Sequence, residues 1–427
     1  GLALILLLPQ AVGYRASYQS LSIDGPRIVI LLIIFLAFLL FSKNLINQQI
    51  KNINVACYFL LSFSILMIVS SLSSQNIYPS LYLSFKLIVI WVLFACAFDY
   101  LNSGINSNLN FLNALNIVLI GLVLYALIEF LLQTYVIPNW LRTSFSNIEE
   151  YKFMNTRILF RNNLILSQGP FTWNHGLGGV LCSLLGMMLF KFENNKVTGS
   201  ILAILFFLAI LTNGMRSVYI ATSLGLIVWC LYRFNLRNIL RLGICILISF
   251  GVYSTKANPK NVVFYNEDMK VSINEYLIHE NFRLDSSKTA KILSKFIPYE
   301  FSTIKTFLDT SGTFSIRLIG FVENVSNYKQ WWLTGYGVGA FQKPGVIQSK
   351  AIQYNDPGLI MLFLFEFGLF PFLIIMLLII LSFCKSIKNE NWMLGIGIAS
   401  WFVFSLSSWA IWPMLLISVF ITKILKS

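Results

Sequence analysis

Long apolar runs alternate with short polar links along most of the chain. Each run is continuous over about twenty residues, the length that an α-helix needs to cross the hydrocarbon core of a bilayer. Counted on this basis, the sequence predicts about twelve spanning helices. The runs lie near residues 1–14, 26–42, 55–74, 81–98, 111–134, 169–191, 198–213, 216–232, 238–254, 357–384, 391–408 and 409–424.

Two polar intervals interrupt this pattern. The longer one covers residues 255–356 and carries many charges of both signs, and a smaller one lies near 135–168. We therefore predict an all-α polytopic membrane protein in which 1–254 holds spans one to nine, 255–356 is one long loop, and 357–427 holds spans ten to twelve. A transmembrane β-barrel is excluded, because its strands alternate apolar and polar residues over about ten positions.

Composition supports a membrane protein. The 427 residues are 57% hydrophobic and only 11% charged, with a mean hydropathy of +0.74, whereas a soluble domain carries about 25% charged residues. Subtracting 17 acidic from 31 basic side chains gives a net charge of +14. Lysines and arginines in cytoplasmic loops explain this charge better than nucleic-acid binding does, so no nucleic-acid partner is predicted.

Basic residues in the short loops predict the orientation. With twelve spans, the short loops fall into two sets on opposite sides of the membrane, and one set holds most of the lysines and arginines. The other set is nearly free of them, apart from Arg15 and Arg216. Both termini are then cytoplasmic, and both polar intervals face outward, into the periplasm of a two-membrane bacterium. Residues 2–12 lack the small-residue cleavage site of a signal peptide and are interpreted as the remnant of a first span. The basic residues of the cytoplasmic set of loops and of the C-terminal tail are Lys43, Lys51, Lys191, Lys196, Arg233, Arg237, Arg241, Lys385, Lys388, Lys423 and Lys426.

Charged side chains inside spans are costly and usually functional. Under the predicted orientation, nearly all of them fall in the outer half: Lys86, Glu129, His175, Arg216 and Glu366. Structural alternatives stay open, because a lysine can snorkel to the surface, carboxylates can form buried ion pairs, and a helix histidine can be hydrogen-bonded in the core. The arginine is hardest to explain structurally, because it lies in a short outer loop.

Such residues suit the transfer of a group from a lipid diphosphate. Arginine binds phosphate through planar, two-pronged hydrogen bonds, and a nearby carboxylate or imidazole can deprotonate an attacking hydroxyl. Aromatic side chains at the end of the long interval, Trp331, Trp332, Tyr336 and Phe341, offer flat apolar faces for sugars. The GYGVGAF stretch there lacks the third glycine and the strand–helix context of a nucleotide loop. Its glycines favour a tight or re-entrant turn instead.

Four stretches then resemble a known family. They are GPFTWNHGLGG, TNGMRS at a span break, SIRLIGFVENVSNYKQWWLTGYGVGAF in the long loop, and YNDPGLIMLFLFEFGLFPF. In this order they resemble the O-antigen ligase and O-antigen/exopolysaccharide polymerase (Wzy-type) superfamily, from about Ser167 to the end of span ten. The resemblance implies a GT-C-like membrane glycosyltransferase that moves glycan from an undecaprenyl-diphosphate carrier to an acceptor hydroxyl at the periplasmic face. It also implies inversion at the sugar and no metal or other cofactor.

The resemblance also suggests roles for residues. Arg216 and Arg317 would bind the carrier diphosphate, and Lys86 is a third candidate. Ligases place a histidine where this chain has YNDPG, which favours a polymerase and leaves the general base open. Asp356 is our hypothesis for that base, with Glu366 or His279 as rivals. Candidate glycan contacts are Trp331, Trp332, Tyr336, Tyr354 and His175.

The resulting prediction is a polymerase that joins lipid-linked repeat units of a surface polysaccharide. The alternatives are a ligase that moves finished glycan to lipid A core or protein, and a transporter for a small anion or oligosaccharide. Expected partners are undecaprenyl-diphosphate-linked oligosaccharides, membrane lipid, a chain-length regulator and a flippase. The expected location is the bacterial inner membrane, with the active face in the periplasm.

Overall fold

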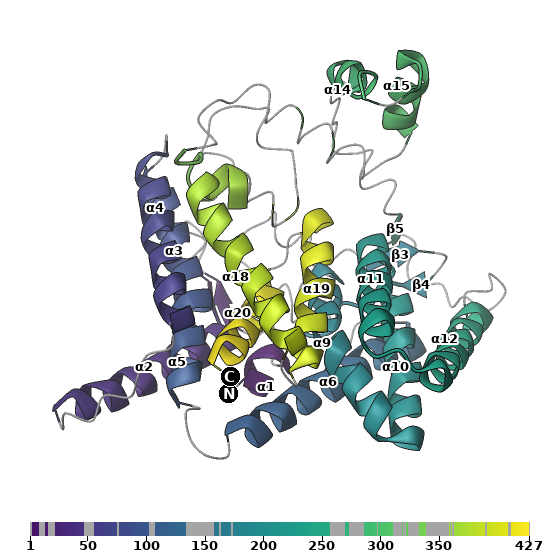
Figure 1. The fold of residues 1–427 in the computed structure, drawn as a ribbon, viewed down its shortest axis with the longest axis horizontal. Helices are drawn as coiled ribbons and strands as arrows, with labels where there is room; N and C mark the ends of the chain where they lie inside the picture. The colour runs from purple at the N-terminus through teal and green to yellow at the C-terminus, as the bar shows by residue number, and fades with distance from the viewer. Residues whose placement is uncertain are drawn as a thin grey trace.

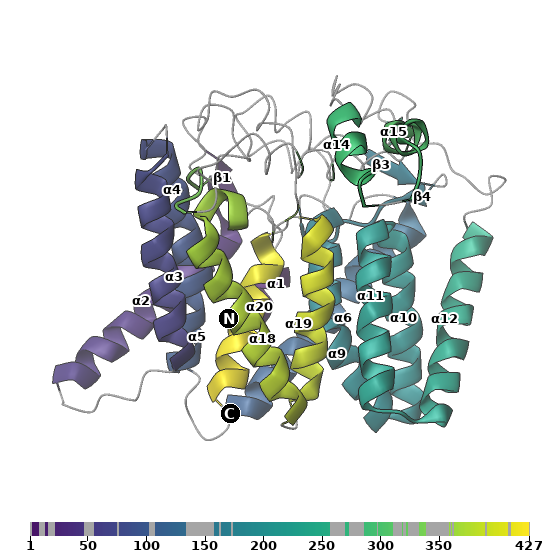
Figure 2. The ribbon, with the colours of Figure 1, turned by 45° about the horizontal axis from the view of Figure 1, so that its top comes forward.

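The chain folds into a bundle of helices with short strands and a helix pair at one end (Figures 1 and 2). In this computed structural model, the described residues are 2–7, 13–15, 22–46, 55–74, 77–101, 107–133, 158–161, 164–171, 174–256, 270–272, 286–296, 298–310, 318, 322, 333–338, 358, 360, 363–388, 391–408 and 411–426.

The bundle consists of helices that follow the apolar runs closely. Figure 2 shows most of them standing side by side. Their bounds are α1 Leu2–Leu7, α2 Gly25–Ile46, α3 Val55–Leu72, α4 Ile77–Leu87, the π-helix η1 Ile88–Leu93, α5 Phe94–Leu101, α6 Ser107–Leu132, α9 Asn174–Asn194, α10 Lys196–Asn213, α11 Arg216–Tyr232, α12 Leu236–Lys256, the π-helix η5 Phe363–Phe367, α18 Leu369–Lys388, α19 Trp392–Ser407 and α20 Ile411–Lys426.

Several of these helices are long and apolar enough to cross a bilayer. Six meet both conditions within the described residues: 77–101, 110–132, 174–194, 196–213, 236–256 and 369–388. Shorter apolar helices cover 28–44, 56–72, 216–232, 392–406 and 413–425. The chain is therefore a helical membrane protein, which confirms this part of the predicted fold class. The count of twelve spans, the long periplasmic loop and the GT-C-like arrangement stay predictions.

Short strands link the two polar intervals. A three-stranded sheet has the order β4–β3–β5, with β3 Ile158–Arg161, β4 Leu164–Ile165 and β5 Lys270–Ser272. Strand β3 pairs antiparallel with β4 and parallel with β5. The long interval is thus hydrogen-bonded to the smaller one. A separate hairpin pairs β1 Gly13–Arg15 with β2 Ser22–Asp24.

Helix α9 is the most enclosed of the candidate spans, and small residues allow its neighbours to approach closely. A Cβ atom added to Gly186 would lie 1.8 Å from the main-chain oxygen of Met393 in α19. A Cβ atom added to Gly397 would lie 2.2 Å from the main-chain oxygen of Ser183. Glycine and serine at such contacts let two membrane helices pack backbone to backbone, because no side chain separates them.

Gly186→Val is therefore expected to lower the stability of the bundle strongly. Overpacking a core costs about 1–3 kcal/mol or more, and here the clash is with main chain that cannot rotate away. The measurement is the thermal melting of the purified protein in detergent. Gly243→Val is the matched control, because nothing lies within 4 Å of a Cβ atom at Gly243. Equal melting temperatures for the two variants would show that α9 and α19 do not pack in this way.

Side-chain contacts gather several basic loops at one end of the bundle. The indole nitrogen of Trp229 donates to the carboxylate of Glu193 (2.8 Å), and Arg233 lies 3.9 Å from the same carboxylate. Lys385 donates to the main-chain oxygen of Leu425 (2.9 Å). These contacts join α9 to α11 and α18 to α20, and the hydroxyl of Tyr232 in α11 donates to the main-chain oxygen of Ile387 in α18. We call this end of the bundle the basic end. Which side of the membrane it faces stays a prediction.

Three predicted boundaries were wrong. Within the run at 1–14, the described helix covers only Leu2–Leu7, and the strand Gly13–Arg15 follows. Helix α9 begins at Asn174 rather than 169. The run at 357–384 is not one helix, because a π-helix ends at Phe367 and Gly368 has a φ of +89° before α18 begins. Glu366 lies in this break and not within a continuous span.

Candidate functional site

A non-helical segment is buried at the end of the bundle opposite the basic end. Residues 164–171 are all buried. The main-chain N–H of Ser167 donates to the carbonyl oxygen of Thr212 at the end of α10 (3.0 Å), and its hydroxyl donates to Ala126 of α6 (3.2 Å). Residues 164–168, predicted to belong to an outer loop, are therefore enclosed between helix ends. We call this region the polar end.

Glu129 holds this segment in place. Its carboxylate, fully buried near the end of α6, accepts hydrogen bonds from the main-chain N–H groups of Gln168 (2.8 Å) and Gly169 (3.0 Å). Gly169 has a φ of +60°, which favours glycine. Because buried main-chain donors need acceptors, a carboxylate here stabilises a turn that lies outside regular secondary structure. This role is structural.

Glu129→Ala is expected to destabilise the polar end. Each buried donor left without an acceptor costs about 1–3 kcal/mol, so two of them make a large loss. Glu129→Gln keeps an acceptor oxygen at the same place and should retain most of the stability. Thermal melting of the two purified variants tests this expectation. A glutamine variant as unstable as the alanine variant would mean that the negative charge, and not the acceptor, is required.

Two asparagines join the start of α9 to the end of α10. The side-chain amide of Asn213 donates to the main-chain oxygens of Asn174 (2.8 Å) and Ser167 (3.3 Å). The side chain of Asn174 donates back to the main-chain oxygen of Asn213 (3.4 Å). Gly214 follows with a φ of +69° and ends α10. This turn places Arg216 as the first residue of α11.

Arg216 is exposed at the polar end. The N-terminus of α11, which it opens, and the N-terminus of α9, held through Asn174 and Asn213, lie close together. Each helix N-terminus carries about half a positive charge, and neither first turn contains an acidic residue. An exposed guanidinium beside two helix N-termini favours binding of an anion, phosphate above all.

His175 and Gly358 lie against the end of α19 at the same polar end. The Nδ1 atom of His175, which is half-buried, forms a hydrogen bond with the hydroxyl of Ser408. A Cβ atom on Gly358 would lie 2.4 Å from the main-chain oxygen of Leu406, and its φ is +79°. Gly358, the glycine of the YNDPG stretch, thus packs against the end of α19, and Ser408 at the same end contacts His175.

A second group of predicted residues lies in another part of the molecule. Residues 333–338, which we call the docked turn, contact the helix break at 363–368. The N–H of Tyr336 donates to the carbonyl oxygen of Phe365 (2.9 Å), and the N–H of Gly337 donates to that of Glu366 (3.0 Å). Tyr336 is only 9% exposed, which argues against its predicted role as an aromatic side chain that contacts the glycan. The Glu366 side chain is fully buried too.

Lys86 belongs to this second group. It is half-buried on α4, which packs against α3. Figures 1 and 2 both place α4 on the opposite side of the bundle from α11, the helix that begins with Arg216. The structure therefore does not bring Lys86 and Arg216 together as two cations of one diphosphate site.

The remaining predicted site residues lie outside the described residues: Asp356, His279, Arg317, Trp331, Trp332 and Tyr354. Within the described part of the chain, no three His, Cys, Asp or Glu side chains are grouped to hold a metal ion. Sequence reasoning missed Ser167, Gln168, Asn174 and Asn213 as parts of the polar end. The available signal was the pair of turn sequences SQG and TNG beside apolar runs.

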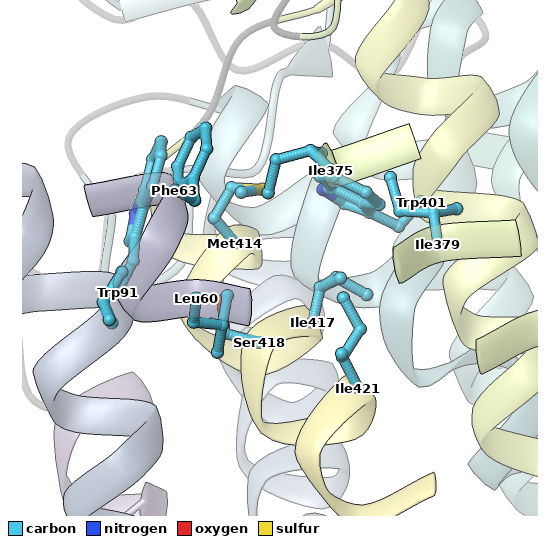
Figure 3. A pocket seen from close by; sticks show the side chains of 11 residues that line it. Leu60, Phe63, Trp91, Ile375, Ile379, Trp401, Met414, Ile417, Ser418 and Ile421 are labelled. Atoms are coloured by element: carbon cyan, nitrogen blue, oxygen red, sulfur yellow. The ribbon is translucent and has the colours of Figure 1, made fainter. Parts of the chain in front are cut away.

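An apolar cavity lies deeper in the bundle, between α3, η1, α18, α19 and α20. Figure 3 shows Phe63 and Trp91 on one side of it, Ile375 and Trp401 on the other, and Met414 between them. Its volume is about 10 Å³, room for one water-sized sphere. A cavity of this size and lining cannot hold a sugar.

The comparisons with known proteins leave the family open. No family model matches the chain. No curated protein matches it either. The resemblance to the ligase and polymerase superfamily rests on the quoted stretches of sequence alone.

Proposed function

We propose that the chain is a polysaccharide polymerase, a membrane glycosyltransferase that joins undecaprenyl-diphosphate-linked repeat units. The observation that carries the proposal is the exposed Arg216, which opens α11 beside the N-terminus of α9. It lies at the opposite end of the bundle from Glu193, Arg233 and Lys385, which mark the basic end. A positive centre there suits the diphosphate of a lipid carrier whose tail lies in the membrane.

Topology supports the same assignment. Loops rich in lysine and arginine usually face the cytoplasm, and the basic end contains such loops. The polar end then faces the periplasm of a bacterial inner membrane, and the last turn of α20, which contacts Lys385 at the basic end, faces the cytoplasm. A flipped, lipid-linked repeat unit would reach Arg216 from that side.

The reaction we propose is a single displacement at the donor sugar. The bond between its anomeric carbon and the diphosphate oxygen breaks, and a bond to the acceptor hydroxyl oxygen forms on the opposite face. The hydroxyl proton passes to a carboxylate, and undecaprenyl diphosphate leaves with the electron pair. Arg216 would stabilise the charge that grows on the diphosphate, as preorganised donors do for other developing anions.

Asp356 is the general base that we propose. It precedes Gly358 by two positions in the sequence, and Gly358 packs against the end of α19, which also contacts His175. The rival Glu366 is fully buried in the helix break beside the docked turn, and its main-chain oxygen is bonded to Gly337. A buried carboxylate there is poorly placed to meet a glycan that arrives at the polar end.

Reconstitution tests the proposal. The purified chain is placed in vesicles with an undecaprenyl-diphosphate-linked repeat unit, and the products are separated by size. Polymerisation predicts a ladder of glycans and one released undecaprenyl diphosphate for each new linkage. Transfer only to added lipid A core would indicate the ligase instead. Movement of the substrate across the membrane with no new linkage would indicate the transporter.

A further inference from the structure

The long polar interval contains a pair of short helices that fold on each other. Helix α14 covers Ser286–Leu293 and α15 covers Phe301–Thr310. Ala290 and Ile304 form their shared core and are 0% and 7% exposed. Figure 1 shows the pair standing away from the bundle. We call this unit the helix pair.

Aromatic side chains are exposed in the connection between the two helices and at the first residue of α15. Phe296 is 81% exposed, Tyr299 is 64% exposed and Phe301 is 43% exposed. Main-chain hydrogen bonds hold the two ends of the connection: the N–H of Phe296 donates to the carbonyl oxygen of Leu293 (2.9 Å), and the N–H of Ile304 donates to the carbonyl oxygen of Glu300 (3.1 Å). Three aromatic side chains are thus exposed here instead of being buried in the shared core of the helix pair.

Exposed lysines accompany these rings. Lys288 and Lys291 on α14 and Lys295 in the connection are all exposed, and the connection also holds one exposed acidic side chain, Glu300. Phenylalanine and tyrosine rings settle at the level of lipid headgroups, and lysines beside them are attracted to anionic lipids. Aromatic rings together with positive charge therefore match the surface of a bilayer better than they match bulk water.

We propose that the helix pair is an interfacial anchor that inserts its aromatic connection into the headgroup region of an anionic bilayer. The partner that the aromatic side chains contact is the membrane that already surrounds the spans. This commitment rests on the charge of the lysines and on the attachment of the helix pair, at both ends, to a membrane-embedded chain. The anchor does not depend on the proposed polymerase activity.

Spin-label accessibility tests the anchor in the full-length protein. Phe296→Cys is labelled in a background in which the exposed Cys384 is replaced by serine, and Thr306→Cys, exposed on α15, is the matched control. The protein is reconstituted into vesicles of phosphatidylethanolamine and phosphatidylglycerol. We expect the label at 296 to be relaxed by oxygen and shielded from a water-soluble nickel complex, and the label at 306 to show the reverse.

The other outcomes each overturn part of the proposal. Access to the nickel complex at both positions would place the connection in water. Dipolar broadening of the spectrum of the label at 296 would indicate that the connection contacts a second copy of the chain instead of lipid. Shielding that appears only after lipid-linked glycan is added would indicate a sugar platform. Equal insertion into vesicles of phosphatidylcholine alone would show that the lysines do not select anionic lipid.

Discussion

Replacing Arg216 with alanine is expected to remove long-chain polymer from the cell surface while single repeat units remain. The guanidinium is exposed beside the N-termini of α9 and α11, where it would meet the donor diphosphate. A hydrogen bond to a charged group contributes about 1.5–3 kcal/mol, which corresponds to about a 10- to 150-fold lower rate. Arg216→Lys keeps the charge without the two-pronged geometry and should give an intermediate ladder. Gel separation of surface glycans measures both effects.

Arg237→Ala is the matched control. Arg237 is also exposed, but it lies near the start of α12, next to the basic end. Its loss removes the same charge from the protein without touching the polar end, so the ladder should keep its length. Normal long-chain polymer in the Arg216→Ala strain, with the protein present at wild-type level, would contradict a role for this arginine.

Valine at Gly335 or Gly337 is expected to release the docked turn from the helix break. The two glycines have φ values of +70° and +91°, a region that L side chains rarely adopt. A Cβ atom on Gly335 would lie 2.3 Å from the main-chain oxygen of Glu366, and one on Gly337 would lie 2.4 Å from the Cβ atom of Ser74. Neither contact can be relieved by turning a flexible side chain, so the turn must move away.

Thiol labelling reports this release. Ser80 is fully buried, and its hydroxyl lies 2.8 Å from the place of a Cβ atom on Gly337. A Ser80→Cys protein should react slowly with a charged thiol reagent, and much faster once Gly337→Val is added. Gly251→Val is the control, because nothing lies within 4 Å of a Cβ atom there. Slow labelling in all three proteins would mean that the turn is not held by these glycines.

Helix positions could be predicted from the sequence where apolar runs end at turn residues. The run at 216–232 became α11 with the same bounds, and the run at 198–213 became α10, which begins at Lys196. The run at 357–384 was wrongly predicted to form a single helix, because hydrophobicity does not reveal a break in the backbone. The carbonyl oxygens of Phe365 and Glu366 in that break accept hydrogen bonds from the docked turn, which is distant in sequence.

The candidate site could be predicted only in part. Arg216 was found from its charge in a short outer loop, where basic residues are rare. Asn213 and Gln168 carry no charge, and the turn sequences that contain them do not reveal which groups their polar atoms bond to until the chain is folded. Lys86 was predicted to join Arg216 in binding the diphosphate because both fall in the outer half of the membrane. Depth in the membrane does not show which helices are neighbours.

The most direct measurement of the central claim is a gel of surface and lipid-linked glycans from a deletion strain. The strain is complemented with the wild-type chain or with Asp356→Asn. Polymerase activity predicts that the ladder collapses to one repeat unit in the deletion strain, and that the wild type restores it whereas the variant does not. A full ladder that persists on its lipid carrier and is missing only from lipid A core would contradict the polymerase and identify a ligase.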